Sequence, residues 1–400
     1  MWTVLFAAHL VSGALPFGDA LQQARALPAV QADERAQEAR AALAHDTSRL
    51  LENPVLQVQP GARRISKGDT TPEVYVALSQ RFNLSSAGAK RQKTLALEVA
   101  HDAALVGLSL RDARQRIAEA WLSRWAADQA REVSQREVAL AEQLLQLIDT
   151  TFQAGEATLV DVSAARAWKA EAVLSELSME GQAYEAGIQL ARAVGAQDGE
   201  PRAAAGELPS IDLPSEASLR AHVGHVEDTV PVREARAAQQ SELARLSEIE
   251  ASKAPSFGLG AMAWREGGGD FAAVAMLEAQ LPLFDRGERE RAVQAAVAER
   301  ARGRMQDSML AQRALRVRML HDLEHTHAVA SALESQLLRA AHELADAHHK
   351  RFQAREATAQ DWVIARRAVL SASIQLIQAR AAEVLARFVV AESFAPEAAQ

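Results

Sequence analysis

An internal duplication constrains the fold of this chain more than any other feature. The segment FQAGEATLVDVSAAR begins at Phe152, and FQAREATAQDWVIAR begins at Phe352. Nine of these fifteen positions are identical. Further matching segments occur in the same order in both halves: residues 27–43 and 230–246, residues 53–68 and 254–269, and residues 75–91 and 276–291. Repeated segments in one order indicate two copies of the same structural unit.

A linker rich in glycine and proline separates the two copies. Three prolines and three glycines lie between Gly195 and Ala217, where they interrupt any helix. In each repeat we expect a medium helix, a β-hairpin, a very long helix, the repeated turn and a second long helix. The predicted organisation is a first repeat over residues 15–194, a linker over residues 195–217, a second repeat over residues 218–390 and a C-terminal tail over residues 391–400.

Two very long helices are predicted, over residues 89–153 and 288–353. Good helix formers fill both runs, and only Gly107 and Gly303 interrupt them. Each run of roughly 65 residues would be about 100 Å long, several times the length of a helix in a globular protein. The returning helices are expected over residues 158–194 and 358–390. A seven-residue spacing in the second repeat, typical of a coiled-coil seam, connects Leu323, Ala330, Leu337 and Leu344.

Two β-hairpins are predicted, over residues 54–84 and 255–284. Val74, Val76 and Leu78 alternate with other residues, and glycines at both expected turns favour chain reversal. Each strand would have about nine to twelve residues, which fits a tilted strand that crosses a membrane. An isolated hairpin is at best marginally stable in water, so these hairpins need partners beyond one chain. The strands have no obvious aromatic girdle, and the only candidates for one are Tyr75, Phe257, Trp264 and Phe271.

Composition excludes several classes of function. The net charge of −8 and the isoelectric point near 5.8 argue against nucleic-acid binding, which usually needs a basic face. The chain has no cysteine, which excludes disulfides, thiolate metal ligands and a cysteine nucleophile. It contains neither a glycine-rich phosphate loop nor a Gly-x-Ser-x-Gly motif. We therefore predict that the protein is not an enzyme and needs no cofactor.

Residues 1–14 are predicted to be a signal peptide. The apolar stretch WTVLFAAHLV precedes Ser12, Gly13 and Ala14, whose small size suits cleavage after Ala14. The alternative is a buried N-terminal segment, because the positive charges that usually begin a signal peptide are missing. Past this segment no run of eighteen apolar residues occurs, so no transmembrane helix is expected.

The order of these elements resembles the TolC-type outer membrane efflux proteins. The strongest markers are LPLFDRGERERAVQAA, over residues 281–296, and the repeated turn at Phe152. The resemblance covers residues 18–388, almost the whole chain. It implies a mainly α-helical fold with a small membrane β-barrel. Each protomer would give four strands to a twelve-stranded barrel, and coiled-coil helical hairpins would form a periplasmic α-barrel.

The resemblance also implies partners and a location. It implies a homotrimer in the outer membrane of a Gram-negative-type cell, in contact with outer membrane lipid and extending into the periplasm. A trimer would close the barrel and remove the exposed strand edges. The protein would dock to a periplasmic adaptor protein and act with an inner-membrane pump such as an RND or ABC transporter. No nucleic acid is expected as a partner.

The implied function is a passive exit duct of a tripartite efflux or type I secretion system. Its cargo would be small molecules, metal ions or polypeptides. The alternative is a soluble periplasmic coiled-coil scaffold without a pore. Fractionation into the outer membrane and single-channel conductance distinguish these two functions.

The repeated turns are the expected docking sites for the adaptor protein, because they would be the tips of the two helical hairpins. Gly155 suits the left-handed position that ends a helix, and Thr158 or Asp161 can cap the next helix. The second turn has Arg355 in place of this glycine, so the same left-handed cap is less favourable there. The implied docking residues are Phe152, Gly155, Glu156, Thr158, Phe352, Arg355, Glu356 and Thr358.

Acidic residues after the turns are candidates for a pore constriction. The resemblance implies that three copies of Asp361 line the periplasmic end of the tunnel, with Asp161 in a lesser role and Trp362 narrowing the opening. A ring of carboxylates attracts cations. The alternative is that both aspartates only cap their helices. Arg166 and Arg366 are expected to pair with acids on neighbouring helices.

A pair of histidines is a candidate metal site. His321 and His325 lie four residues apart on a predicted helix, with Glu324 beside them. This spacing can chelate zinc or copper. The alternative is a solvated helix face whose histidines bind nothing.

Overall fold

The structure of the chain is a computed structural model. It describes residues 13–47, 53–64, 68, 70–83, 86–265, 269–280, 284, 286–354 and 356–394. Most of the predicted signal peptide, the end of the predicted C-terminal tail and Arg355 lie outside the described residues.

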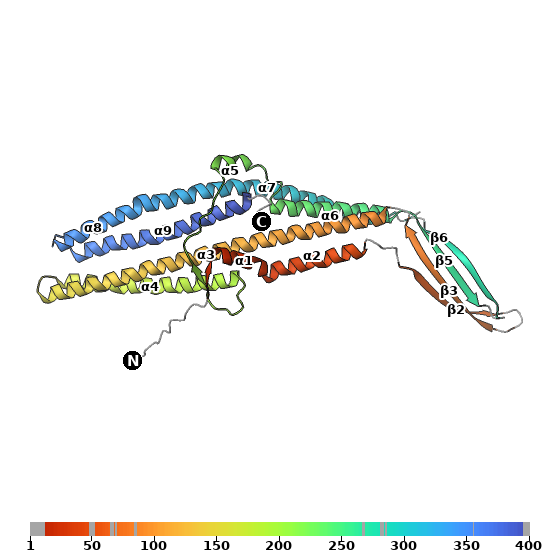
Figure 1. Cartoon of the computed structure of the whole chain (residues 1–400), viewed down its shortest axis with the longest axis horizontal. Helices are drawn as coiled ribbons and strands as arrows, with labels where there is room; N and C mark the ends of the chain where they lie inside the picture. The colour runs from red at the N-terminus through yellow and green to blue at the C-terminus, as the bar shows by residue number, and fades with distance from the viewer. Residues whose placement is uncertain are drawn as a thin grey trace. The chain divides into compact units, whose positions relative to one another are not determined.

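Long helices alternate with two pairs of strands along the chain (Figure 1). In chain order the elements are β1 (Ala14–Pro16), α1 (Phe17–Gln22), a 3-10 turn (Gln23–Ala26), α2 (Pro28–Thr47), β2 (Val55–Arg64), β3 (Thr70–Asn83), α3 (Ala87–Gln153), α4 (Leu159–Ala193), β4 (Ala203–Ala205), α5 (Glu216–His222), α6 (Val230–Ser252), β5 (Ser256–Arg265), β6 (Phe271–Gln280), α7 (Glu288–Ala332), a π-helical segment (Leu333–Leu338), α8 (Arg339–Gln353) and α9 (Ala359–Phe394).

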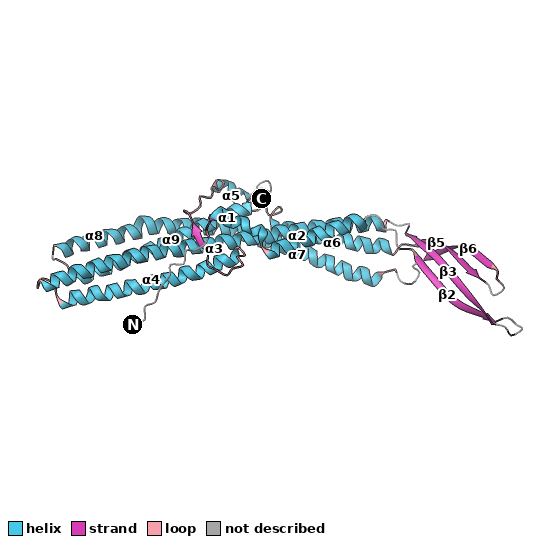
Figure 2. Cartoon of the chain, turned by 60° about the horizontal axis from the view of Figure 1, so that its bottom comes forward, coloured by secondary structure: helices cyan, strands magenta, loops and turns pink. Residues whose placement is uncertain are grey.

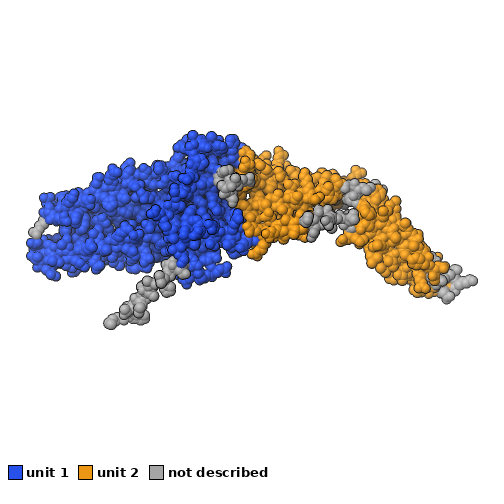
Figure 3. All heavy atoms as spheres, in the orientation of Figure 1, with its two compact units in different colours: residues 1–31, 109–226, 312–400 blue, residues 32–108, 227–311 orange. Residues whose placement is uncertain are grey.

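The chain forms two compact units, and each combines segments of both repeats (Figure 3). The first unit contains residues 1–31, 109–226 and 312–400, and the second contains residues 32–108 and 227–311. The helices α3 and α7 contribute residues to both units. The two repeats are therefore folded into each other, and equivalent segments of both repeats share a unit.

The second unit contains a four-stranded antiparallel sheet in the order β2-β3-β5-β6 (Figure 2). The β2–β3 hairpin ends with the pair Arg64 and Thr70, and the β5–β6 hairpin ends with the pair Arg265 and Phe271. These are the same positions in the two aligned repeats, so both hairpins have the same register. The strands β2 and β6 lie at the two edges of this sheet.

Helices α2 and α6 and the adjoining ends of α3 and α7 complete the second unit. Their core has few large side chains, and ion pairs connect the helices along their length. These pairs include Arg40 with Asp102 at 3.1 Å, Arg91 with Glu248 at 3.0 Å and Lys253 with Glu290 at 2.8 Å.

The hydrophobic core of the first unit surrounds Trp121 of α3. Its side chain is fully buried, and its indole N–H donates a hydrogen bond of 2.7 Å to the carbonyl oxygen of Leu15. Phe17 contacts the Trp121 ring edge-on and also contacts Phe388 of α9. Together with the parallel pairing of β1 and β4, these contacts attach the first described residues to the core.

The second long helix differs from the uninterrupted α-helix that the sequence predicts. A π-helical segment covers Leu333–Leu338, and such a segment adds a residue to the helical repeat. The predicted seam holds at Ala330, but Leu337 and Leu344 are 46% and 48% exposed, whereas Ala345 is buried. Within one chain the buried row therefore lies one position later than the predicted seam beyond Ala330, because the π-helical segment adds a residue.

None of the described helices has both the length and the apolar character that crossing a membrane requires.

Candidate functional site

The first repeated turn ends α3 with a cap that depends on glycine. The backbone N–H of Gly155 donates to the carbonyl of Phe152, and that of Glu156 donates to the carbonyl of Thr151, both at 2.9 Å. This pair of hydrogen bonds is the Schellman arrangement of a helix C-terminus. Gly155 has a φ of +76°, which glycine adopts without the clash that a Cβ atom brings.

A reciprocal cap begins each returning helix. The Thr158 hydroxyl accepts a hydrogen bond from the backbone N–H of Asp161 at 3.2 Å, and the Asp161 carboxylate accepts one from the backbone N–H of Thr158 at 3.0 Å. Thr358 and Asp361 form the same two hydrogen bonds at 3.3 and 3.1 Å. The capping role is therefore present at both aspartates, and a pore role for them stays a prediction.

The second turn forms one of the two backbone hydrogen bonds that cap the first. The backbone N–H of Glu356 donates to the carbonyl of Arg351 at 2.8 Å, at the position equivalent to Glu156 and Thr151. The two phenylalanines, in contrast, have different surroundings. Phe152 is exposed, whereas Phe352 stacks on Trp362 with 5.9 Å between the ring centroids.

The two turns lie at the same end of their helical hairpins (Figure 1), and a hydrogen bond connects them. The second carboxylate oxygen of Asp161 accepts a hydrogen bond of 3.4 Å from the backbone N–H of Ala359, the first residue of α9. The rings of Trp168 and Trp362 lie 6.1 Å apart in the core beneath the turns. The sequence did not indicate these contacts, because they join the repeats rather than residues within one repeat.

Trp362 fills this core. It is 7% exposed, and its ring lies 4.5 Å from that of His349 and close to those of Phe352 and Trp168. Within one chain the ring therefore packs between helices. Its expected role in narrowing an opening stays a prediction for the assembled protein.

The hydrogen bonds at the caps favour the charged form of both aspartates. Burial acts to raise the pKa of the Asp161 carboxyl, but hydrogen bonds from Thr158 and from the backbone of Ala359 outweigh it and hold the pKa below its ordinary value. The hydrogen bonds from the Thr358 hydroxyl and backbone likewise lower the pKa of Asp361, with smaller effects of His348 and Arg351. Both caps therefore stay intact at neutral pH.

The repeated arginines pair with acids on a neighbouring helix, as predicted, but in different surroundings. Arg166 lies 3.6 Å from Asp149, and both side chains are well exposed. Arg366 of α9 lies 2.6 Å from Glu137 of α3, whose side chain is 3% exposed. The second pair joins the two helical hairpins through a buried carboxylate.

The sheet of the second unit has one apolar face and one polar face. The register places Val74, Val76 and Leu78 of β3 on the apolar face, where all three are exposed. Glu73 and Tyr75 lie on the other face, where the Tyr75 hydroxyl donates a hydrogen bond of 2.7 Å to the Glu73 carboxylate. Because side chains alternate along a strand, the two faces continue across all four strands, although β6 also places Val274 and Met276 on the polar side.

The register also divides the expected girdle aromatics. Phe257 and Phe271 lie on the apolar face, and Phe82 lies there opposite Phe257. Tyr75 and Trp264 lie directly opposite each other on the polar face, where their rings stack at 6.1 Å. Of the four girdle candidates, Phe257 and Phe271 are therefore the two on the apolar face.

His321 and His325 lie on one side of α7, with their rings stacked at 5.9 Å. Among the residues that the structure describes, no three histidine, aspartate or glutamate side chains gather in a way that could hold a metal ion. A metal site at this pair stays a hypothesis.

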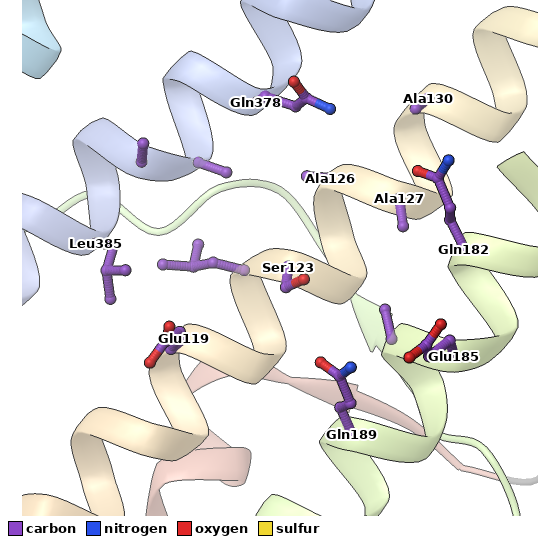
Figure 4. A pocket seen from close by; sticks show the side chains of 14 residues that line it. Glu119, Ser123, Ala126, Ala127, Ala130, Gln182, Glu185, Gln189, Gln378 and Leu385 are labelled. Atoms are coloured by element: carbon purple, nitrogen blue, oxygen red, sulfur yellow. The ribbon is translucent and has the colours of Figure 1, made fainter.

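A groove of about 480 Å³ lies between α3, α4 and α9 in the first unit (Figure 4). Small side chains such as Ala126 and Ala130 line it together with polar side chains such as Gln182, Glu185 and Gln378. The groove follows from the alanine-rich packing of these helices, because alanine leaves space that larger side chains would fill.

Solved structures of outer membrane proteins resemble this fold over almost the whole chain. The outer membrane protein VceC from Vibrio cholerae matches with a TM-score of 0.69 and 18% identity, over 94% of this chain and 96% of that chain. The CmeC outer membrane channel of Campylobacter jejuni matches with a TM-score of 0.70 and 12% identity, over 94% and 85% of the two chains.

A third similar structure is the open state of the MtrE outer membrane channel of Neisseria gonorrhoeae. Its TM-score is 0.66 and its identity 16%, over 94% of this chain and 88% of that chain. No protein-family model and no curated protein sequence matches the chain.

These solved structures define the fold class of the chain, which is the fold of outer membrane channels. More specifically, the chain has the TolC-type fold, with long helical hairpins and four strands. The resemblance seen in the sequence correctly predicted this fold.

Proposed function

We propose that the protein is a passive outer membrane channel that serves as the exit duct of an efflux system. The observation that carries this proposal is the two-faced sheet, on a chain with the fold of outer membrane channels. One face exposes valine, leucine and phenylalanine side chains, as a lipid-facing wall requires. The other face carries glutamate, glutamine and tyrosine side chains, which suit a water-filled interior.

The open edges of the sheet support a trimer. A sheet with exposed edges at β2 and β6 leaves unpaired backbone groups, which are very costly in lipid. Three chains would close a twelve-stranded barrel and pair every edge. We propose such a homotrimer in the outer membrane, with the helical hairpins in the periplasm.

The repeated turns are the proposed contact sites for a periplasmic adaptor protein. Phe152, Glu156 and Glu356 are exposed around the two turns, and the caps fix the backbone that presents them. Energy for transport would come from an inner-membrane pump of the RND or ABC class. Drugs, metal ions and secreted polypeptides are the cargo classes compatible with such a duct.

The decisive experiment measures assembly and conductance in one preparation. Detergent-extracted protein, corrected for bound detergent, should have a mass near three times 43.2 kDa and should form discrete conducting channels in planar bilayers. A monodisperse monomer without conductance would support the soluble scaffold instead.

A further inference from the structure

On the apolar face of the sheet, the charged side chains lie at the rim, the end where the two hairpins turn. Among the described strand residues of this face, the two charged side chains are Arg64, the last residue of β2, and Arg265, the last residue of β5. Both lie at the end of the sheet that is away from the helices of the second unit. The exposed apolar side chains on the same face include Leu56, Val58, Val74, Val76, Leu78, Leu259, Phe271 and Leu277.

The two arginines occupy the same position in the two repeats. Arg64 pairs with Thr70 and Arg265 pairs with Phe271, at equivalent places in the two hairpins. When β2 and β5 are aligned, the only identical residues are these arginines and the alanines two positions earlier, Ala62 and Ala263. All four lie on the apolar face, so both repeats place a positive charge at this rim.

Arginines on the polar face have acidic neighbours within the sheet. Arg63 lies 3.8 Å from Glu73, and Arg81 lies 3.9 Å from Glu278. The described strand residues of the apolar face include no acid that could play this part for Arg64 or Arg265. A guanidinium group beside lipid needs an anionic partner, and the described strand residues of this face supply none.

The spacing along the strand places this rim at a membrane boundary. Phe257 and Arg265 lie on the same face of β5, about 26 Å apart at roughly 3.3 Å per residue. That distance is on the order of the apolar band of a membrane barrel. A long arginine side chain at the edge of this band can reach the headgroup region, where a phosphate can accept two parallel hydrogen bonds from it.

We propose that Arg64 and Arg265 bind the phosphate groups of membrane lipid headgroups around the outer rim of the barrel. The inference rests on the proposed function, because a trimeric barrel makes this face a lipid contact. Equivalent hairpins in that barrel would reach the same level, so that six arginines form one ring. This ring would fix the height of the barrel in the membrane and select lipids with an exposed phosphate.

The test compares two lipids that share acyl chains and differ in the headgroup. Full-length trimer in neutral detergent is mixed with phosphatidic acid or phosphatidylcholine, and the bound lipids are counted by native mass spectrometry. Wild-type protein should prefer phosphatidic acid by about tenfold, as expected for charge-assisted hydrogen bonds. The Arg64→Gln/Arg265→Gln variant should lose this preference, and Arg64→Lys/Arg265→Lys should keep most of it.

The matched control removes two arginines from the polar face. Arg63→Gln/Arg81→Gln changes the net charge by the same amount and should keep the wild-type preference.

Equal lipid preference in wild type and in Arg64→Gln/Arg265→Gln would overturn the proposal. Loss of lipid binding on addition of excess inorganic phosphate would also overturn it, because that result would indicate a site for a soluble anion. Conductance and mass are measured on the same samples. A monomeric, non-conducting wild type would overturn the proposed channel itself, whereas a conducting trimer without lipid preference would overturn only this inference.

Discussion

Glu137 and Asp149 are two carboxylates of α3 that pair with equivalent arginines of the two repeats. Asp149 remains hydrated beside Arg166, and exposed pairs of this kind contribute little to stability. Glu137 is buried beside Arg366, and the loss of one partner from a buried pair is costly because the other charge stays behind. The equivalent arginines of the two repeats therefore contribute different amounts to stability.

Glu137→Ala should therefore lower the free energy of unfolding by about 3 kcal/mol, and Asp149→Ala by less than about 1 kcal/mol. Chemical denaturation followed by the helical signal gives both values. Hydrogen exchange should place the effect of Glu137→Ala in α3 and α9. Equal losses in the two variants would contradict the structural difference between the pairs.

The caps of α4 and α9 should respond to acid. The pKa values of Asp161 and Asp361 are lowered by hydrogen bonds, so the folded chain holds these protons less tightly than the unfolded chain. Their stabilisation is then fully present above the unfolded pKa of about 3.9 and is lost as the pH falls through the lower folded value.

Asp161→Ala and Asp361→Ala should thus weaken the protection of amides in the first turns of α4 and α9 to a constant extent between neutral pH and about pH 5. The difference from wild type should shrink below about pH 4. Hydrogen exchange across this range measures it. A difference that grows on acidification would show that the charged form is not the capping form.

At the scale of elements, the long helices and hairpins could be predicted because their signals are local. Unbroken helix formers indicate α3, and alternation with turn glycines indicates β2 and β3. The pairing of β1 with β4 could not be predicted, since strands of three residues show no periodicity. The π-helical segment also has no local signal, because its effect appears only in which residues pack against α9.

Deletion of Ser335, within this π-helical segment, should restore a regular α-helix and keep Ala341 and Ala345 in their buried row. Deletion of Gln135, the equivalent residue of the regular helix α3, should instead rotate every later residue of that helix. We expect the first variant to retain most of its thermal stability and the second to lose much more. Thermal unfolding followed by circular dichroism compares the two variants. Equal losses of thermal stability would contradict the idea that the π-helical segment accommodates one extra residue.

The first turn should be sensitive to substitution, because its cap depends on glycine. Gly155→Pro removes the N–H that donates to Phe152 and cannot adopt the positive φ. The variant, or a polar linker in place of residues 152–161, should abolish export while trimer formation and membrane insertion stay intact. Export of a fluorescent dye from cells, normalised to protein abundance, tests this. Normal export would remove the turn from the docking site.

The candidate site could be predicted only in part. The repeated turns and their caps follow from glycine, threonine and aspartate at fixed spacings. The contact of Asp161 with Ala359 and the burial of Trp362 depend on how two hairpins pack, which no spacing within one repeat encodes. The two faces of the sheet required the register, because β6 is apolar on both sides near Val274 and Met276.

For the whole molecule, the central question is what three copies of Asp361 would do. In the proposed trimer their carboxylates would form a ring that binds multivalent cations. Asp361→Ala should raise the resting conductance and weaken block by such cations added on the side of the turns. Asp161→Ala should do so less, because Ala359 also donates to its carboxylate. Bilayer recordings of the three proteins decide this, and identical block in wild type and Asp361→Ala would leave Asp361 as a helix cap.

The matching registers of the two hairpins give the strands a higher symmetry than the helices. In the proposed trimer the barrel wall would repeat six times around its axis. The π-helical segment and the buried partner of Arg366 occur in one repeat only, so the helical part would repeat three times. A half-length ancestor with a single hairpin could have closed the same wall as six identical subunits. Fusion of two such halves frees one turn to diverge for a partner while the wall that faces the lipid keeps its original geometry.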